Sequence, residues 1–149
     1  MIKWQYKSFE QLSVNQLYDI LKLRQDVFVI EQQCIYSDID QVDKTATHLF
    51  AYSDEGDGVR AYLRILAPGV KYKQVAMGRV LTSESSRGTG LGKALMNEAL
   101  QVVAREYPKQ AIKISAQVYL IDFYREFDFT VISEPYDEDG IEHIDMLRS

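Results

Sequence analysis

The sequence predicts a mixed α/β fold, in which a central β-sheet is flanked by α-helices. Strand-like apolar runs alternate with helical repeats along the chain, and a glycine-rich turn joins one strand-like run to the longest helical repeat. The chain is 46% hydrophobic and 26% charged, which is typical of a globular protein. We expect its 149 residues to form a single domain over 1–149.

The first predicted elements are a strand over residues 2–7 and a helix over residues 14–31. The strand alternates apolar and polar side chains, whereas the helix has apolar residues at helical spacing. Ser13 and Gln16 form a capping box at the start of this helix. Arg24 interrupts its apolar side, and we expect the charged end of Arg24 to extend to the surface.

The segment 32–46 lacks clear periodicity and contains the pattern Asp38-x-Asp40-x-x-Asp43. This spacing resembles a calcium-binding loop only superficially, because the glycine and the closing glutamate that such a loop requires are missing. We therefore expect a solvated acidic loop and no metal site.

The remaining elements are predicted from strand-like runs, helical spacing and turn residues. A long helix begins near Leu91 and should end near Tyr107, because Pro108 disfavours a helical conformation at the residue before it. The predicted strands are 47–52 and 59–66, joined by a hairpin connection at 53–58, then 74–82, 112–117, 129–133 and 141–147, with a further helix at 118–127 and a turn at 136–140.

Composition also limits the classes of partner. A formal net charge of −5 argues against nucleic acid, because neutralising phosphates requires a basic surface. No apolar stretch approaches the roughly 18 residues of a membrane span, and the first residues do not resemble a signal peptide. The single cysteine, Cys34, cannot form an internal disulfide, so we expect a buried thiol in a reducing compartment. These observations predict a cytoplasmic protein without a nucleic-acid or membrane partner, and they leave a homodimer open.

The glycine-rich turn is Arg87-Gly88-Thr89-Gly90-Leu91-Gly92, at the start of the long helix. Unpaired N–H groups at a helix N-terminus attract phosphate. Glycines allow a ligand to approach the backbone, and Arg87 adds a forked cation. A Walker loop is excluded because three residues, not four, separate Gly88 from Gly92-Lys93, and the dinucleotide motif is excluded because the glycines run G-x-G-x-G.

After an apolar strand, the pattern R-x-x-G-x-G resembles the coenzyme A loop of the GCN5-related N-acetyltransferase (GNAT) superfamily. The predicted order of elements is similar to the GNAT fold. The segment 123–129 resembles the family's Phe-Tyr-x-x-x-Gly-Phe motif, with Asp128 in place of glycine, and Asp tolerates the left-handed backbone. Further similarity to the ElaA-like branch lies in Val27-Phe28-Val29-Ile30-Glu31-Gln32, Asp38-x-Asp40, Thr47-His48-Leu49, Gly78-Arg79-Val80, Ala116-Gln117 and Glu138-Asp139-Gly140-Ile141-x-His143.

This resemblance implies an N-acetyltransferase that moves an acetyl or other acyl group from acetyl-CoA to a primary amine of a small molecule or peptide. It also implies that the strand at 74–82 diverges from the strand at 112–117, so that pantetheine inserts between them. The cofactor-binding residues implied by the resemblance are Val80, Leu81 and Thr82 for the pantetheine arm, and Arg87, Gly88, Thr89, Gly90, Gly92 and Lys93 for the diphosphate.

Acyl transfer needs a free amine and a proton donor for the departing thiolate. Tyr124 matches the family's tyrosine and is the candidate general acid. The general base is less clear, because residues 77–80 carry no carboxylate where many relatives have a glutamate. Glu31 and His143 are the leading candidates. His48 and Glu142 are further candidates, and both histidines have a structural role as the alternative.

Arg79 admits two interpretations, an ion pair with Glu31 or a contact with a carboxylate of the acceptor. The missing strand glutamate also leaves open a non-catalytic coenzyme A-binding sensor. A nucleotide-binding protein is a third reading, which the excluded loop spacings disfavour.

Overall fold

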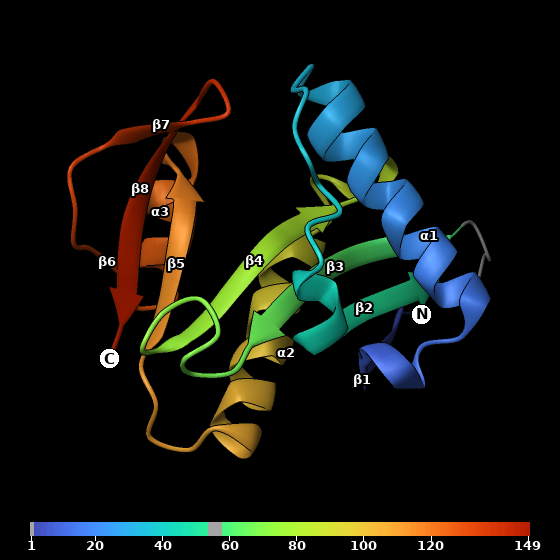
Figure 1. Cartoon of the computed structure of the whole chain (residues 1–149), viewed down its shortest axis with the longest axis horizontal. Coiled ribbons are helices and arrows are strands. Elements are labelled where there is room, and N and C mark those ends of the chain that lie inside the picture. Colours follow the sequence, from blue (N-terminus) through green and yellow to red (C-terminus); the bar gives the residue numbers. More distant parts are fainter. Residues whose placement is uncertain (1, 54–57) are drawn as a thin grey trace.

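The computed structural model describes residues 2–53 and 58–149, so most of the predicted connection at 53–58 lies outside the described residues. Within them, eight strands form one mixed sheet in the order β1-β2-β3-β4-β5-β8-β6, and β7 pairs with β8 (Figure 1). This confirms the predicted mixed sheet. The strands are β1 (Ile2–Ser8), β2 (Thr47–Ser53), β3 (Val59–Leu66), β4 (Val75–Thr82), β5 (Ile112–Gln117), β6 (Thr130–Val131), β7 (Tyr136–Glu138) and β8 (Ile141–Arg148).

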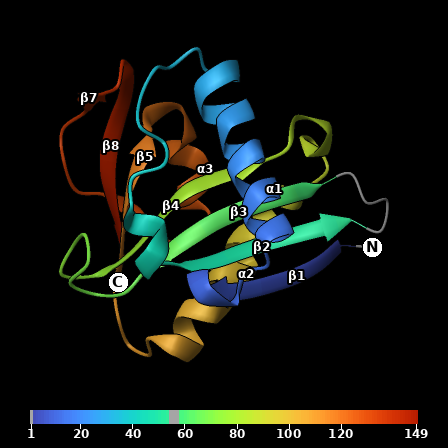
Figure 2. The ribbon, with the colours of Figure 1, turned by 45° about the vertical axis from the view of Figure 1, so that its right-hand side comes forward.

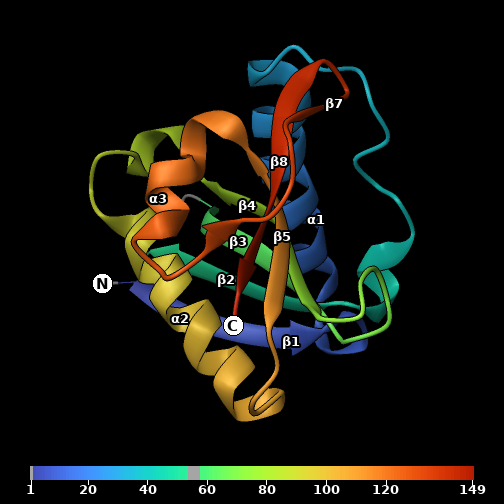
Figure 3. The ribbon, with the colours of Figure 1, turned by 90° about the vertical axis from the view of Figure 1, so that its left-hand side faces the viewer.

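Helices cover both faces of the sheet. The helix α1 crosses the face formed by β2 and β3 (Figure 2), while α2 and α3 lie on the opposite face (Figure 3). The helices are α1 (Val14–Arg24), continued by the π-helix η2 (Gln25–Glu31), then α2 (Leu91–Glu106) and α3 (Ile121–Arg125), with the short 3₁₀ turns η1 (Phe9–Gln11), η3 (Val42–Thr45), η4 (Glu84–Ser86) and η5 (Val118–Leu120).

Local sequence accounts for where these helices begin and end. The Ser13 Oγ accepts a hydrogen bond from the Gln16 N–H at 3.0 Å, and the Gln16 side chain accepts one from the Ser13 N–H at 3.0 Å. This is the predicted capping box, which satisfies two groups that a helix start leaves unpaired. The helix α2 ends at Glu106, in front of Tyr107 and Pro108, as predicted.

Apolar side chains on the two faces of the sheet form separate clusters. The larger cluster joins α2 and α3 to β2, β3, β4, β5 and β8, and its members include Leu95, Ala99 and Val102 of the predicted helical stripe. The second cluster joins α1 to the opposite face of the sheet and includes Ile20 and Phe50. Burying each large apolar side chain contributes about 1.5–3 kcal/mol. These clusters therefore hold α1 on one face of the sheet and α2 and α3 on the other.

The strands β4 and β5 start together and then separate. Their parallel pairing covers Val75 with Ile112 and Ala76 with Lys113, and β4 diverges from β5 beyond these pairs (Figure 1). On its other edge β4 pairs with β3, but the register shifts between Tyr62 and Arg64. Two residues of β4 then stand opposite one residue of β3, which is the geometry of a β-bulge and bends the bulged strand.

Several sequence-based boundaries near the C-terminus were wrong. The helix predicted over 118–127 is a 3₁₀ turn followed by the five-residue α3, and the strand predicted over 129–133 is reduced to β6. The predicted turn at 136–140 contains β7, so that the reversal of the chain occurs at Asp139 and Gly140. Asp128 has φ 67°, as expected for a residue in place of glycine.

Candidate functional site

A cavity of about 800 Å³ opens where β4 and β5 separate. Its wall also includes residues from η2, from the segment 32–46, from η5 and α3, and from the β7–β8 hairpin. The diverging strands therefore bring together residues that lie far apart in the sequence. Among the predicted site residues, those that line this cavity are Glu31, Val80, Leu81, Thr82, Arg87, Tyr124 and His143.

The glycine loop leads from the cavity into α2. Gly88 and Gly90 have φ 77° and 83°, and a Cβ at either position would meet no atom within 4 Å. Gly90 is the N-cap of α2 and provides no side-chain cap; the first N–H to bond within this helix is that of Ala94, to the Gly90 carbonyl. The N–H groups before Ala94 remain available for an anion, so the geometry of the loop fits a diphosphate.

The other loop residues have smaller roles in the wall of the cavity. Gly88, Thr89, Gly90, Gly92 and Lys93 do not line the cavity itself. The hydroxyl of Thr89 donates to the Ser86 carbonyl, and Lys93 lies 3.5 Å from a Glu126 carboxylate oxygen on the surface. Gly88, Thr89, Gly90 and Lys93 are nevertheless exposed at the start of α2, and Gly92 is half-buried, so a ligand that extends out of the cavity could contact this loop.

Arg87 is held by Glu31 across the mouth of the cavity. Its two terminal nitrogens donate to the two Glu31 carboxylate oxygens at 2.5 and 3.0 Å, which is the forked arrangement that arginine forms with carboxylates. This hydrogen bond raises the pKa of Arg87. Of the two interpretations left open for Arg79, the ion pair with Glu31 was therefore wrong, because Arg87 occupies the Glu31 carboxylate.

Tyr124 lies at the inner wall of the cavity, 5% exposed, with its ring against Phe123 and Phe129. Its hydroxyl forms no hydrogen bond with another side chain or backbone group of residues 2–53 and 58–149. Burial raises the pKa of this phenol, so it stays protonated at neutral pH. Tyr124 can therefore donate a proton inside the cavity.

His143 also lines the cavity. Its Nδ1 lies 2.8 Å from the Ile141 carbonyl oxygen, and its Nε2 lies 3.4 Å from a Glu138 carboxylate oxygen. A carbonyl oxygen only accepts hydrogen bonds, so Nδ1 carries a proton and Nε2 is the atom that can take up another. The Glu138 carboxylate oxygen is an acceptor that lies beside this atom.

The two remaining candidates for the base are not at the cavity. His48 is fully buried: its Nε2 donates to the Asp43 carbonyl at 2.9 Å, and its Nδ1 accepts from the Tyr62 hydroxyl at 2.6 Å. Burial lowers the pKa of His48, which keeps the ring neutral. Glu142 is exposed and does not line the cavity. These contacts fit a structural role for His48, which was the alternative to a role as the base.

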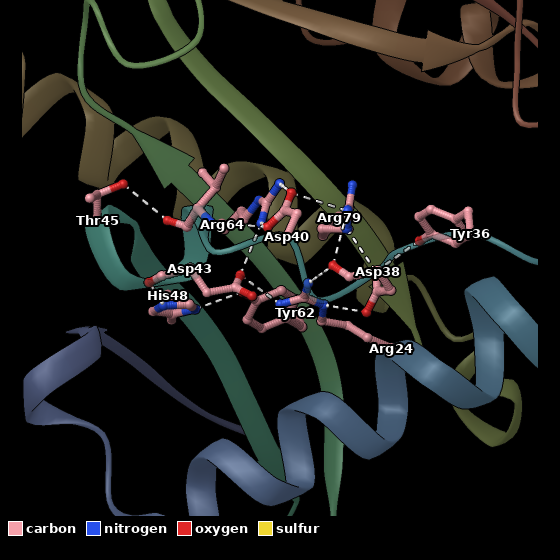
Figure 4. Close-up of polar contacts among 11 residues, drawn as sticks. Arg24, Tyr36, Asp38, Asp40, Asp43, Thr45, His48, Tyr62, Arg64 and Arg79 are labelled. Atoms are coloured by element: carbon pink, nitrogen blue, oxygen red, sulfur yellow. Dashed lines mark hydrogen bonds and ion pairs between the residues drawn. The ribbon is translucent and has the colours of Figure 1, made fainter.

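A buried ionic network holds the segment 32–46 against the sheet (Figure 4). The expectation that Arg24 extends to the surface was wrong, because its side chain is 0% exposed. Its Nε lies 3.0 Å from an Asp38 carboxylate oxygen, and its Nη1 lies 2.7 Å from an Asp43 carboxylate oxygen. The helix α1 therefore turns this cation inward, toward acids of the following segment.

The expectation of a solvated acidic loop was also wrong. Asp38 and Asp43 are buried, and Arg64 of β3 bonds to Asp43 at 2.9 Å and to both Asp40 oxygens at 2.7 and 2.9 Å. Burial opposes ionisation of Asp40, but the hydrogen bond and charge of Arg64 lower the pKa of Asp40 to about 2. Buried charges persist when they are paired in this way.

Arg79 joins this network at the wall of the cavity. Its Nε lies 2.8 Å from an Asp38 carboxylate oxygen, and its Nη2 donates to the Asp38 carbonyl at 3.1 Å and to Asp40 at 3.3 Å. The guanidinium also lies over the ring of Tyr36, 5.4 Å from its centre. The members of the network that line the cavity are Tyr36, Asp40, Arg64 and Arg79.

Three further properties concern the described residues. No group of three or more His, Cys, Asp or Glu side chains among them is arranged to hold a metal ion. No helix in residues 2–53 and 58–149 combines the length and apolar character needed to cross a membrane. Cys34 is buried, and its thiol donates to the Asp139 carbonyl at 3.1 Å, which joins two walls of the cavity.

The fold and the site together define a class of protein. The sequence model of the family described as the acetyltransferase (GNAT) domain matches residues 14–149. The chain therefore belongs to the GNAT family, and acyl transfer is the class of reaction that this family membership supports.

Within this family the chain is similar to ElaA proteins over its whole length. It is 41% identical to Protein ElaA of Escherichia coli over 148 residues, which are 99% of this chain and 97% of ElaA. A UPF0039 protein of Synechocystis is 43% identical over 146 residues, 98% of this chain and 94% of the relative. These relatives confirm the predicted ElaA-like branch.

Two crystal structures have the same fold over 100% of both chains. That of Escherichia coli ElaA has a TM-score of 0.93 at 40% identity, and that of an acyl-CoA N-acyltransferase from Pseudomonas aeruginosa has a TM-score of 0.93 at 38% identity. The predicted GNAT fold is thereby confirmed.

Proposed function

We propose that this protein is an N-acetyltransferase that transfers an acetyl group from acetyl-CoA to a primary amine. The observation that carries the proposal is the separation of β4 and β5 beside an uncapped helix N-terminus. Backbone groups of a separated strand edge bind an extended amide-containing chain, and the loop at the start of α2 suits a diphosphate. Both features occur in one continuous stretch of chain, from Val75 to Lys93.

Within this proposal, Val80, Leu81 and Thr82 contact the pantetheine arm, and the loop from Arg87 to Lys93 contacts the diphosphate. The bound acetyl-CoA supplies the thioester. The carbon–sulfur bond breaks as a carbon–nitrogen bond forms, the amine loses one proton, and the sulfur leaves as a thiol after gaining one. The side chains proposed to handle these protons line the same cavity.

We assign the proton donor role to Tyr124, because its protonated hydroxyl has no competing partner among the described side chains. His143 and Glu31 are the proposed bases. The Glu31 carboxylate must first separate from Arg87, whereas His143 lies with its Nε2 beside Glu138 and needs no such separation. A diphosphate bound by Arg87 would favour that separation, because both anions compete for one guanidinium.

Two measurements test the proposal. In thermal unfolding, acetyl-CoA should raise the midpoint more than ATP or NAD, since a ligand at 100 times its Kd stabilises the folded state by about 2.7 kcal/mol. Thiol release in the presence of acetyl-CoA and a panel of amines should then show turnover. Acetyl-CoA binding without transfer to any amine would instead support the non-catalytic sensor, which the absence of a carboxylate at residues 77–80 favours.

A further inference from the structure

The backbone of Arg79 has a conformation that few residues of its type adopt. Arg79 lies in the β-bulge of β4 with φ 53°, in the left-handed region. This conformation is uncommon for residues other than glycine, asparagine and aspartate, and such strain often marks a functional position. The long cationic side chain of this residue contacts Asp38 and Asp40, along the wall of the cavity.

One edge of the Arg79 guanidinium remains open to the cavity. Nε and Nη2 face Asp38 and Asp40, whereas Nη1 makes no hydrogen bond with any residue of 2–53 or 58–149. Figure 4 shows a terminal nitrogen of Arg79 that points away from the acidic side chains. The side chain is 21% exposed and lines the cavity, so the two N–H groups of Nη1 can bind a ligand there.

The acids behind Arg79 are already neutralised. Arg24 bonds to Asp38 and Asp43, and Arg64 bonds to Asp43 and to both oxygens of Asp40. Three guanidinium groups thus balance three carboxylates, and a carboxylate that approached Nη1 would meet no unpaired acid. Tyr36 lies against one face of the Arg79 guanidinium, so Nη1 is the part of this cation that is left to donate to a ligand carboxylate.

We propose that the acceptor is a free amino acid, whose carboxylate binds Nη1 of Arg79 while its amine faces the acyl donor. This inference rests on the proposed acetyltransferase function and deepens it. Arg79 lies one residue before Val80, on the strand assigned to the thioester arm, so an anion on its side chain keeps the substrate close to the reacting centre. His143 lines the same cavity as Arg79, and so does Glu31, which could face the ammonium group once it separates from Arg87.

The test uses the natural chain and acceptor pairs that differ at one group. Transfer from acetyl-CoA is measured for a panel of amino acids and for the matching amino acid amides, each corrected for its fraction of free amine. We expect kcat/KM to be about ten- to a hundredfold higher for the best amino acid than for its amide, which is the range for one charge-assisted hydrogen bond. Equal or faster transfer to the amides, or to lysine side chains of a peptide, would overturn the inference.

A variant then assigns the preference to Arg79. Arg79→Gln should remove most of the preference for the amino acid over its amide by raising the KM for the amino acid, and should leave the KM for acetyl-CoA unchanged. The control is Arg105→Gln, on the exposed end of α2, which should keep this preference. If Arg79→Gln unfolds, the comparison of amino acids with their amides in the natural chain still tests the acceptor class. Failure of acetyl-CoA to bind would contradict the proposed function, whereas transfer with a preference for amides would contradict only the acceptor class.

Discussion

The buried Tyr124 hydroxyl gives the clearest prediction for a single side chain. Tyr124→Phe should lower kcat about a hundredfold, as expected for the loss of a general acid, and leave the KM for acetyl-CoA nearly unchanged. Steady-state thiol release measures both constants. Tyr18→Phe, on the exposed side of α1, is the matched control and should behave like the natural chain. Unchanged turnover in Tyr124→Phe would remove this assignment.

His48 should make stability depend on pH. Its pKa is lowered by burial in the folded protein, so the unfolded chain binds a proton first as the pH falls below 6.5. The contribution of the neutral His48 to the free energy of unfolding is fully present above pH 6.5. It is lost as the pH falls toward the pKa of His48 in the folded protein, at up to about 1.4 kcal/mol per pH unit. Urea unfolding at pH 7, 6 and 5 measures the slope, which His48→Gln should reduce. The same slope in both proteins would contradict this account.

The glycine loop offers a matched pair of substitutions within one element. Gly90 has φ 83°, so Gly90→Ala should cost about 1–2 kcal/mol although the added Cβ meets no atom. Gly92 lies inside α2, where alanine is favoured by up to about 1 kcal/mol, and its new Cβ would lie 3.8 Å from the Phe123 ring, an ordinary contact. Gly92→Ala should therefore be neutral or stabilising. Chemical denaturation tests both, and equal losses would be inconsistent with the difference in backbone conformation.

Elements with strong periodicity could be predicted from the sequence, and short ones could not. The helix α2 and the strands β1 to β5 agree with their predicted positions within one or two residues. The elements α3, β6 and β7 are too short to show a period, and their existence depends on pairing with β8 or packing on α2. Local residue patterns do not contain that information.

The ionic network shows why the environment of Arg24 was predicted wrongly. Its partners lie in a segment without periodicity, 14 and 19 residues further on, and Arg64 and Arg79 reach the same acids only through the register of β3 and β4. One signal was present in the sequence: Arg24 and Arg64 both interrupt apolar runs, and a charge in such a run requires an opposite charge nearby. The segment 32–46 supplies three aspartates.

At the scale of the molecule, the diphosphate loop could be predicted because it is contiguous, whereas the cavity could not. Glu31 and Arg87 are 56 residues apart, and their contact requires η2 to meet the start of α2. The wall that we assign to the acceptor combines η2, the segment 32–46 and the β7–β8 hairpin, which the sequence order does not place together.

The separation of β4 and β5 should be visible in hydrogen exchange. Backbone amides of residues 77–82 that face β5 lack a partner strand, so they should exchange faster than those of β2, which is paired on both edges. Addition of acetyl-CoA should slow exchange in residues 77–82 and leave β2 unchanged. Mass spectrometry of peptic fragments measures this difference. Equal protection of both strands before ligand addition would contradict the geometry.

The pairing of β4 with β5 at one end also limits the shape of a molecule that can lie between the two strands. The strands pair at residues 75–76 and 112–113 and diverge from there, while α2 and α3 lie on one face of the sheet (Figure 3). The space between β4 and β5 therefore narrows toward the end at which the two strands are paired. We therefore expect an unbranched chain to reach further between the two strands than a branched one, whatever its polar groups are.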